Sequence, residues 1–222
     1  MQEWTRSRCC ATRTAGALDL HVASVVGVAN DYAARVADLG PVAWPPHPIG
    51  TERLLLREPE ADDRAALIEL FASSEVNTFL GGPRARDDLE RAVPEAPERR
   101  SGFFVVALDG TMIGVVSFDR RDVSRPGQAR DGVEPAGVAE LSYLFLPKAW
   151  GHGYAAEACG AALDWFDSAL PGEPVVLCTQ TANDRSMRLA VKLGFTEVQR
   201  FEEFDARQWF GVRRPDDRPE RA

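Results

Sequence analysis

The apolar positions after residue 51 repeat with two different periods, and this pattern predicts a series of strands and helices. Short continuous apolar runs are typical of buried strands. The expected strands cover 53–57, the two arms of a hairpin at 102–119, 139–146, 174–180, 196–204 and 207–212. Apolar residues at helical spacing predict helices over 60–71, 86–93, 155–167 and 186–193. The order of these elements predicts an α/β fold with a mixed sheet.

Two local patterns support this assignment. Asp109-Gly110 lies between two apolar arms, and both residue types tolerate the positive φ of a two-residue hairpin turn. The helix expected at 155–167 has one apolar face, and most of its acidic residues lie on the other side. The residues of the apolar face are Ala155, Ala158, Cys159, Ala162, Leu163 and Phe166.

A proline-rich segment separates the first part of the chain from the rest. The stretch 41–50, PVAWPPHPIG, contains four prolines, which exclude a helix or a central strand. We therefore interpret 1–50 as an N-terminal extension with a linker, 51–214 as the folded domain and 215–222 as a C-terminal tail. Apolar residues at 17–38 suit one helix, which could dock on the domain or form a homodimer. A chain that starts at Ile49 is expected to fold.

Composition narrows the class of protein. The chain has 222 residues, of which 45% are hydrophobic, and its net charge is −8, which argues against a nucleic-acid partner. No apolar run is long enough to span a membrane. Asp19 and His21 interrupt the apolar part of the N-terminal segment, so it is a poor export signal. The four cysteines lack metal-ligand spacing, which predicts no metal site and a cytoplasmic location.

The most unusual stretch is LFLPKAWGHGYAAEACGAALDWF, residues 144–166. Gly151 and Gly153 lie between the end of a strand and the start of a helix. Free backbone N–H groups and the helix dipole make such a junction an anion site, and glycine lets a phosphate approach the backbone. The alternative is a tight turn that requires small residues. The spacing fits neither a P-loop nor a dinucleotide-binding fingerprint.

Two motifs together make a more specific pattern. The stretch ELSYLFLPKAWGHGYAAEA, followed after one strand by TANDRSMRLAVKLGF, resembles the GCN5-related N-acetyltransferase (GNAT) superfamily. The closest resemblance is to the branch that contains ribosomal-protein and protein N-terminal acetyltransferases, and it covers about 51–212. The family's Arg/Gln-x-x-Gly-x-Gly/Ala loop begins here with Trp150. The resemblance implies a mostly antiparallel mixed sheet, splayed between two adjacent strands and flanked by about four helices.

The same resemblance assigns acetyl-CoA as the co-substrate. It implies that backbone groups of Phe145 and Leu146 pair with the pantetheine arm. The pyrophosphate would then lie on the amides of the loop and the first helical turn, and Asn183 and Ser186 would lie near the pantetheine amides and the thiol. The loop residues are Trp150, Gly151, His152, Gly153, Tyr154 and Ala155. His152 is expected to be a solvent-facing spacer.

The sequence also suggests residues for proton transfer and for acceptor contacts. Glu140, at the start of a central strand, is the expected general base, acting directly or through water. Many relatives carry a tyrosine proton donor at the position of Ala190, so the proton for the thiolate has to come from Ser186 or water. Tyr143 is expected to pack in the core or against the cofactor. Glu202, Glu203, Asp205 and residues 81–86 are the expected acceptor contacts.

The sequence thus predicts an enzyme, an acetyl-CoA-dependent N-acetyltransferase in which a primary amine attacks the thioester directly. The acceptor is either a protein N-terminus or a small amine, including an aminoglycoside-like antibiotic. Two further interpretations remain: a CoA-binding regulatory module without catalysis, and a nucleotide-binding α/β domain.

Overall fold

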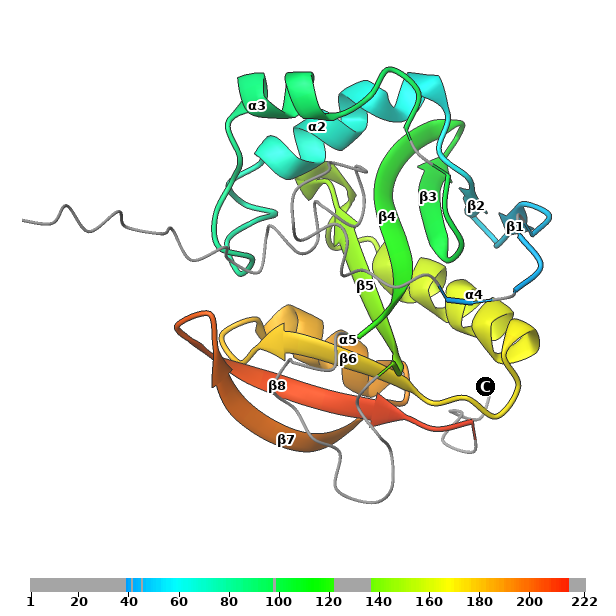
Figure 1. The fold of residues 1–222 in the computed structure, drawn as a ribbon, viewed down its shortest axis with the longest axis vertical. Coiled ribbons are helices and arrows are strands. Elements are labelled where there is room, and N and C mark those ends of the chain that lie inside the picture. Colours follow the sequence, from blue (N-terminus) through cyan, green and yellow to red (C-terminus); the bar gives the residue numbers. More distant parts are fainter. Residues whose placement is uncertain (1–38, 41, 45, 98, 122–136, 216–222) are drawn as a thin grey trace, which may run out of the picture.

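The computed structural model describes residues 39–215 except 41, 45, 98 and 122–136. Within these ranges eight strands form one sheet, in the order β1-β2-β3-β4-β5-β6-β8-β7 (Figure 1). The strands are β1 (Ile49–Gly50), β2 (Leu54–Arg57), β3 (Phe103–Leu108), β4 (Thr111–Arg120), β5 (Ala139–Phe145), β6 (Val175–Gln180), β7 (Thr196–Glu203) and β8 (Ala206–Arg213). The helices are α2 (Arg64–Ala72), α3 (Arg86–Ala92), α4 (Tyr154–Ala169) and α5 (Asp184–Lys192), with 3-10 turns at Ala61–Asp63 and Pro147–Ala149. The expected fold class is confirmed.

The helices cover both faces of the sheet. Successive residues of β3 alternate between two hydrophobic clusters, because side chains along a strand point to opposite faces. Phe103 and Val105 pack with α2 and α3, whereas Phe104 and Val106 pack with α4. Figure 1 shows α2 and α3 together at one end of the molecule and α5 beside β6 at the other. The core is therefore divided by the sheet into two layers.

The turn predicted at Asp109-Gly110 is confirmed. Leu108 pairs with Thr111 across the hairpin, so two residues form the loop between β3 and β4. Asp109 has a φ of 48° and Gly110 a φ of 79°, both in the left-handed region that the twist of a two-residue hairpin requires.

The topology brings β5 and β6 side by side as a parallel pair, connected by α4. Parallel strands need such a crossover, because a short turn cannot return the chain to the same end of the sheet. A buried ion pair fixes α4 to β8. Arg213 of β8 donates two hydrogen bonds, of 2.9 and 2.8 Å, to Asp167 of α4.

The described residues between 39 and 50 pack on the domain. Leu39 is 1% exposed and lies in the same cluster as α4, and the Leu39 carbonyl accepts a hydrogen bond from Arg120 (2.9 Å). The Trp44 ring contacts Phe104 and Trp165, with centroids 5.1 and 5.6 Å away. The segment expected to be a linker thus adds to the core and supplies the edge strand β1. The helix expected at 17–38 and most of the tail at 215–222 lie outside the described residues.

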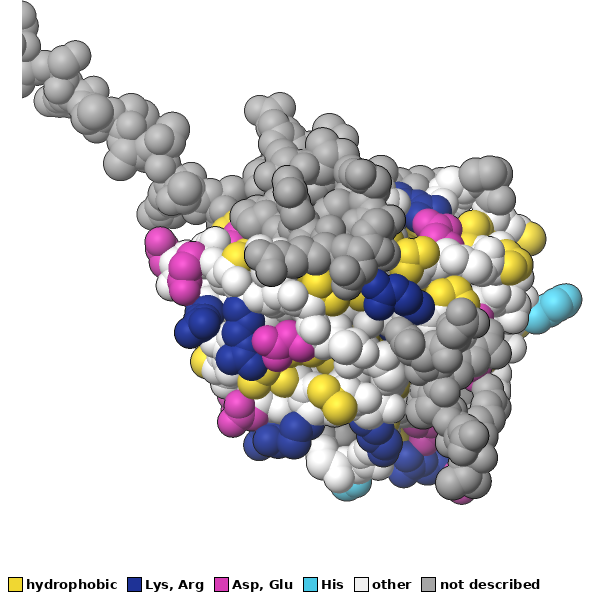
Figure 2. All heavy atoms as spheres, turned by 90° about the horizontal axis from the view of Figure 1, so that it is seen from below, with side chains coloured by type: hydrophobic (Ala, Val, Ile, Leu, Met, Phe, Trp, Pro, Cys, Tyr) yellow, Lys and Arg dark blue, Asp and Glu magenta, His cyan; other side chains and the backbone are white. Residues whose placement is uncertain are grey.

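One face of the molecule carries charges of both signs (Figure 2). On this face, the visible basic and acidic side chains are interspersed, and the visible apolar side chains form small separate groups. Among the described residues, no helix combines the length and the apolar character needed to cross a bilayer.

Candidate active site

The central feature of the site is the divergence of β5 and β6. Their pairing consists of Ala139 with Val175 and Glu140 with Val176, after which β6 pairs only with β8. Leu146 donates its N–H to Ile113 across the β4 side (2.9 Å), and the alternation of an antiparallel ladder therefore turns the peptide groups of Phe145 toward β6. Backbone groups of β5 thus face the opening between the two halves of the sheet.

The two residues expected to bind pantetheine differ in the direction of their backbone groups. Phe145 faces the opening. Leu146 uses its N–H for Ile113, and its carbonyl accepts the N–H of Ala149 (2.8 Å). By the same alternation Tyr143, two residues before Phe145, also turns its peptide groups toward the opening.

The glycine loop follows directly. Gly151 and Gly153 have φ values of 83° and 81°, and Gly153 is the N-cap of α4. A Cβ at Gly151 would meet no atom within 4 Å, so conformation rather than crowding requires glycine there. In the described part of the chain, the amides of Gly151 through Ala155 donate to no backbone carbonyl. The loop therefore combines a tight turn with a set of open N–H groups at a helix N-terminus, which suits an anion.

Trp150 holds this loop against β5. Its indole N–H donates to the Phe145 carbonyl (2.8 Å), and its own amide donates to Pro147 (3.1 Å). The guanidinium of Arg185 lies over the Trp150 ring, 5.6 Å from its centroid, and so links the loop to α5. The backbone N–H of Trp150 is already hydrogen-bonded to Pro147. Trp150 therefore contributes to the loop mainly through its side chain.

A second set of contacts fixes the other side of the loop. Glu157, in the first turn of α4, accepts hydrogen bonds from the Thr51 hydroxyl (2.5 Å) and the Arg53 side chain (2.5 and 2.8 Å). Arg53 also donates to the His152 carbonyl (3.0 Å). Burial acts to raise the pKa of Glu157, but the hydrogen bonds from Thr51 and Arg53 outweigh it, so this pKa is lowered. The segment that leads into β2 thus fixes the N-terminus of α4.

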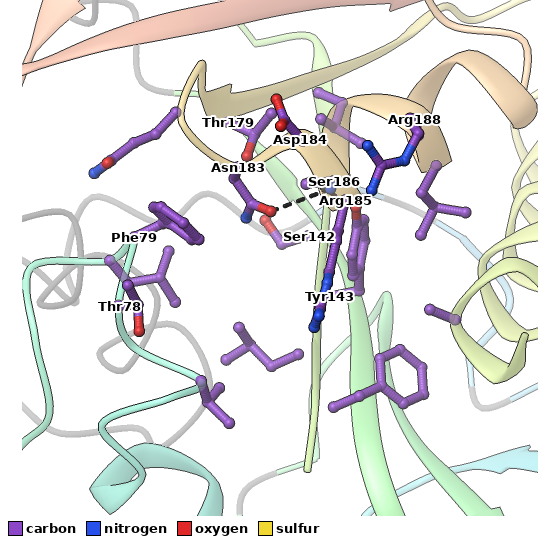
Figure 3. A pocket seen from close by; sticks show the side chains of 18 of the residues that line it. Thr78, Phe79, Ser142, Tyr143, Thr179, Asn183, Asp184, Arg185, Ser186 and Arg188 are labelled. Carbon is purple, nitrogen blue, oxygen red and sulfur yellow. Dashed lines mark hydrogen bonds between the residues drawn. The ribbon is translucent and has the colours of Figure 1, made fainter. Parts of the chain in front are cut away.

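Residues of α5 meet β5 on the other side of the opening. Asn183 caps the helix by accepting the Ser186 N–H (3.1 Å), as shown in Figure 3. The Ser186 hydroxyl lies 2.6 Å from the Tyr143 hydroxyl. Burial is the main cause that raises the pKa of Tyr143, with a smaller contribution from Cys159 and an opposing one from the Ser186 hydrogen bond. Tyr143 therefore stays protonated well above neutral pH and keeps an O–H to share with Ser186.

Glu140 is buried and paired. Its carboxylate accepts a hydrogen bond of 2.8 Å from Arg121, whose side chain is fully buried. The guanidinium of Arg121 also lies over the Phe210 ring, 5.0 Å from its centroid. Glu140 is thus held by a residue that directly follows β4, and the Phe210 ring of β8 packs against that residue.

One cavity of about 1190 Å³ brings these parts together. Its lining includes Phe145, Trp150, Gly151, Gly153, Tyr154, Ala155, Asn183 and Ser186, together with Glu140 and Tyr143. Leu146 and His152 are the two expected cofactor residues that do not line it. The His152 side chain is exposed and stacks on Tyr154, with ring centroids 5.4 Å apart. The volume exceeds that of most small-ligand pockets, so it has room for a cofactor and an acceptor.

The acceptor side of the cavity differs from the expectation. Neither residues 81–86 nor Glu202, Glu203 and Asp205 line it; their neighbours 75–80 and Phe204 do. The loop after α2 is held by Asn77, which is fully buried and whose side-chain amide donates to the carbonyls of Leu70, Phe71 and Ser73. A sequence pattern does not predict that Asn77 is buried, because an asparagine after a helix is also typical of an ordinary exposed turn.

A sequence model described as an acetyltransferase (GNAT) domain matches residues 53–196, the part that contains the loop, α4 and α5. The chain belongs to the GNAT acetyltransferase family. It is 30% identical to the uncharacterized protein YkkB of Bacillus subtilis over 149 residues, which are 65% of this chain and 82% of YkkB.

Solved structures show the same fold as this GNAT domain. A GNAT-family acetyltransferase from Bacillus anthracis matches with a TM-score of 0.58 and 24% identity, over 74% of this chain and 96% of that one. Spermidine N-acetyltransferase from Vibrio cholerae, in complex with CoA and spermine, matches with a TM-score of 0.57 and 20% identity, over 75% and 98% of the two chains. The resemblance to the GNAT superfamily is thereby confirmed.

Proposed function

We propose that this protein transfers the acetyl group of acetyl-CoA to a primary amine. The observation that carries the proposal is the continuity of the site: β5 turns backbone groups toward an opening in the sheet and runs directly into a loop of open amides at the start of α4. A pantetheine arm can pair with a strand, and it is joined to a pyrophosphate. The exposed backbone groups of β5 would therefore bind the arm, and the adjoining loop amides would bind the pyrophosphate. Membership of the GNAT family supports the same assignment.

The residues present fit this cofactor. The amides of Gly151 through Ala155 would hold the pyrophosphate, and the N–H of Phe145, whose carbonyl accepts the Trp150 indole N–H, would pair with the pantetheine arm. Arg185 and Arg188 of α5 line the cavity and carry positive charge for further phosphate oxygens. Asn183, whose side-chain oxygen caps α5, would offer its amide to the arm.

When bound, acetyl-CoA supplies an acyl group activated as a thioester. The protein's part is to orient this group, polarise its carbonyl and move two protons. Backbone N–H groups of β5 that face the opening would polarise the carbonyl. Glu140, held in place by Arg121, would accept the proton of the attacking amine, directly or through water.

The second proton goes to the departing thiolate. Ser186 would donate it, because its hydroxyl lines the cavity and is hydrogen-bonded to Tyr143. The tyrosine that many relatives carry on the helix is replaced by the buried Ala190, and Tyr143 of β5 offers a different route to the same chemistry.

The acceptor differs among proteins of this fold. Structures with TM-scores of 0.56 and 0.57 include the ribosomal alpha-N-protein acetyltransferase RimL, at 14% identity, and an aminoglycoside acetyltransferase with bound ribostamycin, at 17% identity. At such identities the likeness shows the fold alone. Our proposal is therefore an amine acceptor, either a protein N-terminus or a small molecule.

The test is an acetylation screen with the full chain. Acetyl-CoA is incubated with a panel of peptides and small amines, and acetylated products are identified by mass spectrometry while CoA release is measured. We expect at least one amine to gain an acetyl group at a rate above the background without protein. Binding of CoA without acetylation of any amine in the panel would contradict a transferase and favour a regulatory CoA-binding module.

A further inference from the structure

The acceptor end of the cavity contains an aromatic side chain that the core does not use. Phe79 lines the cavity and is half-buried, yet it belongs to none of the hydrophobic clusters of the described residues. Its neighbours Val76 and Leu80 do pack against the α2 and α3 layer. Figure 3 shows Phe79 and Thr78 across the cavity from Asn183 and Ser186. A large ring in this position is available to a ligand.

The loop that carries Phe79 is fixed before any ligand binds. Three carbonyls accept the Asn77 side-chain amide, and the Asn77 carbonyl accepts the N–H groups of Leu80 and Gly82, both at 3.0 Å. A ring on a rigid loop loses little conformational entropy when it contacts a ligand. The loop therefore holds Phe79 in place before an acceptor binds.

A second aromatic residue approaches the cavity from the other half of the sheet. Phe204 lines it from the turn between β7 and β8, with a φ of 55°. This region is unfavourable for a bulky side chain, and two-residue turns usually place Asn, Asp or Gly there. Such outliers are concentrated at functional sites.

The charges of the cavity favour neither a polycation nor a strong anion at this end. Its described charged residues are Glu75, Glu140, Asp184, Arg185 and Arg188. Glu75 and Asp184 are exposed, and the buried Glu140 is paired with Arg121. A polycation that entered the cavity would lose hydration, while the buried carboxylate is already paired with Arg121 and the two exposed carboxylates remain screened by water.

We propose that the acceptor is a primary amine carried on an apolar body, preferably an aromatic ring, that lies against Phe79 and Phe204. Spermine-like and aminoglycoside-like polycations are disfavoured. This inference rests on the proposed acetyl transfer, and it narrows the acceptor to one chemical class.

The first experiment compares acceptors with the full chain and saturating acetyl-CoA. The probes are 2-phenylethylamine, ethylamine, spermine and ribostamycin, and the readout is kcat/KM from CoA release. We expect kcat/KM for 2-phenylethylamine to exceed the values for spermine and ribostamycin by about 10-fold or more, as apolar contacts of this size discriminate. A higher kcat/KM for either polycation would overturn the proposal.

The second experiment changes Phe79. Phe79→Ala should lower kcat/KM for 2-phenylethylamine about 10-fold and leave ethylamine unchanged, because only the larger amine reaches the ring. Phe79→Asp should shift the preference toward spermine by adding an unpaired carboxylate. Val191→Ala is the matched control, since Val191 is an apolar residue of α5 that is 65% exposed and lies outside the cavity. Equal loss for both amines in Phe79→Ala would contradict a contact with the acceptor body.

A binding measurement separates this inference from the proposed function. Calorimetry on the complex with CoA compares 2-phenylethylamine with spermine in wild type and Phe79→Ala. If no amine is acetylated but 2-phenylethylamine binds more tightly and loses that advantage in Phe79→Ala, the transferase proposal fails and the acceptor site stands. If amines are acetylated but spermine binds as tightly as 2-phenylethylamine, the acceptor site fails and the transferase stands.

Discussion

At the scale of single residues, the contact between Tyr143 and Ser186 offers a testable proton route. Ser186→Ala removes the proposed donor, and Tyr143→Phe removes the group behind it while keeping the ring. We expect both to lower kcat about 10-fold, less than the usual effect of a general acid, because a thiol pKa near 8.5 already makes a tolerable leaving group. Acetyl-CoA affinity should change little.

The measurement is kcat and KM against pH, with Ser186→Thr as the conservative variant. The threonine should recover part of the rate, because it retains a hydroxyl. A rate for Ser186→Ala equal to the wild type would assign the proton to water instead.

Glu140 can be tested in a similar way. Glu140→Gln keeps the size of the side chain and removes the proton acceptor, so turnover should fall about 10²-fold or more. Acetyl-CoA affinity should be retained, since the loop at Gly151–Ala155 is not altered. Because the fully buried Arg121 would lose its charged partner, the free energy of unfolding has to be measured in parallel. A stable variant with unchanged turnover would exclude Glu140 as the base.

Tyr143 also predicts a dependence of stability on pH. Its pKa is raised in the folded protein above the ordinary value of about 10, so its contribution is complete below pH 10. Above that pH the unfolded chain releases the proton while the folded chain keeps it, and the free energy of unfolding falls by about 1.4 kcal/mol per pH unit. Burial raises the pKa of Cys159 as well, so the decline begins at lower pH. Urea unfolding at pH 9 to 11 should show a smaller decline for Tyr143→Phe.

At the scale of the elements, the junction of β5, the glycine loop and α4 determines cofactor binding. Gly153→Val should abolish the stabilisation by CoA, which reaches about 2.7 kcal/mol at 100 times the dissociation constant. The variant also places a β-branched residue at a φ of 81°, with a cost of about 1–3 kcal/mol. The quantity to compare is therefore the shift in melting temperature on adding CoA, not the melting temperature itself.

Gly172→Val is a matched control for this experiment. Gly172 has a φ of 82°, open space around its Cβ position and no part in the cavity. It should show the strain and keep the full CoA shift. Retention of the shift in Gly153→Val would contradict the loop as the pyrophosphate site.

The elements show what sequence patterns determine. Periodicity and turn chemistry predicted the Asp109-Gly110 hairpin and the strand–glycine–helix junction, because their causes are local. The Tyr143–Ser186 contact depends on how α5 packs against β5, and the Glu140–Arg121 pair depends on the β4–β5 register. Such partners are set by tertiary packing, which a single sequence does not reveal. The cavity is lined by residues 75–80 and Phe204, which adjoin the expected acceptor contacts, and Asn77 fixes the first of these loops through hydrogen bonds to carbonyls four to seven residues earlier. Whether an asparagine side chain turns inward to such carbonyls depends on burial, which the sequence pattern does not show.

At the scale of the whole molecule, the question is where the folding unit begins. Prolines at 41–50 led us to expect a domain that starts near residue 51, but composition does not report what a proline-rich segment packs against. Leu39 and Trp44 contact the layer formed by α4, and Trp44 also donates to Glu58 (2.9 Å). We therefore propose that the folding unit begins near Leu39.

Truncation and substitution test this boundary together. Trp44→Ala should lower the free energy of unfolding by about 2–3 kcal/mol, less than for a fully buried tryptophan because the ring is only partly buried. A chain that starts at Ile49 loses Leu39 as well and should be less stable than the variant, whereas a chain that starts at Leu39 should match the full chain. His47→Ala is the control in the same segment, since His47 is exposed and should have little effect. Urea unfolding gives each value. If the chains starting at Leu39 and at Ile49 unfold at the same urea concentration, residues 39–48 add nothing to the core, and the boundary lies near residue 50 after all.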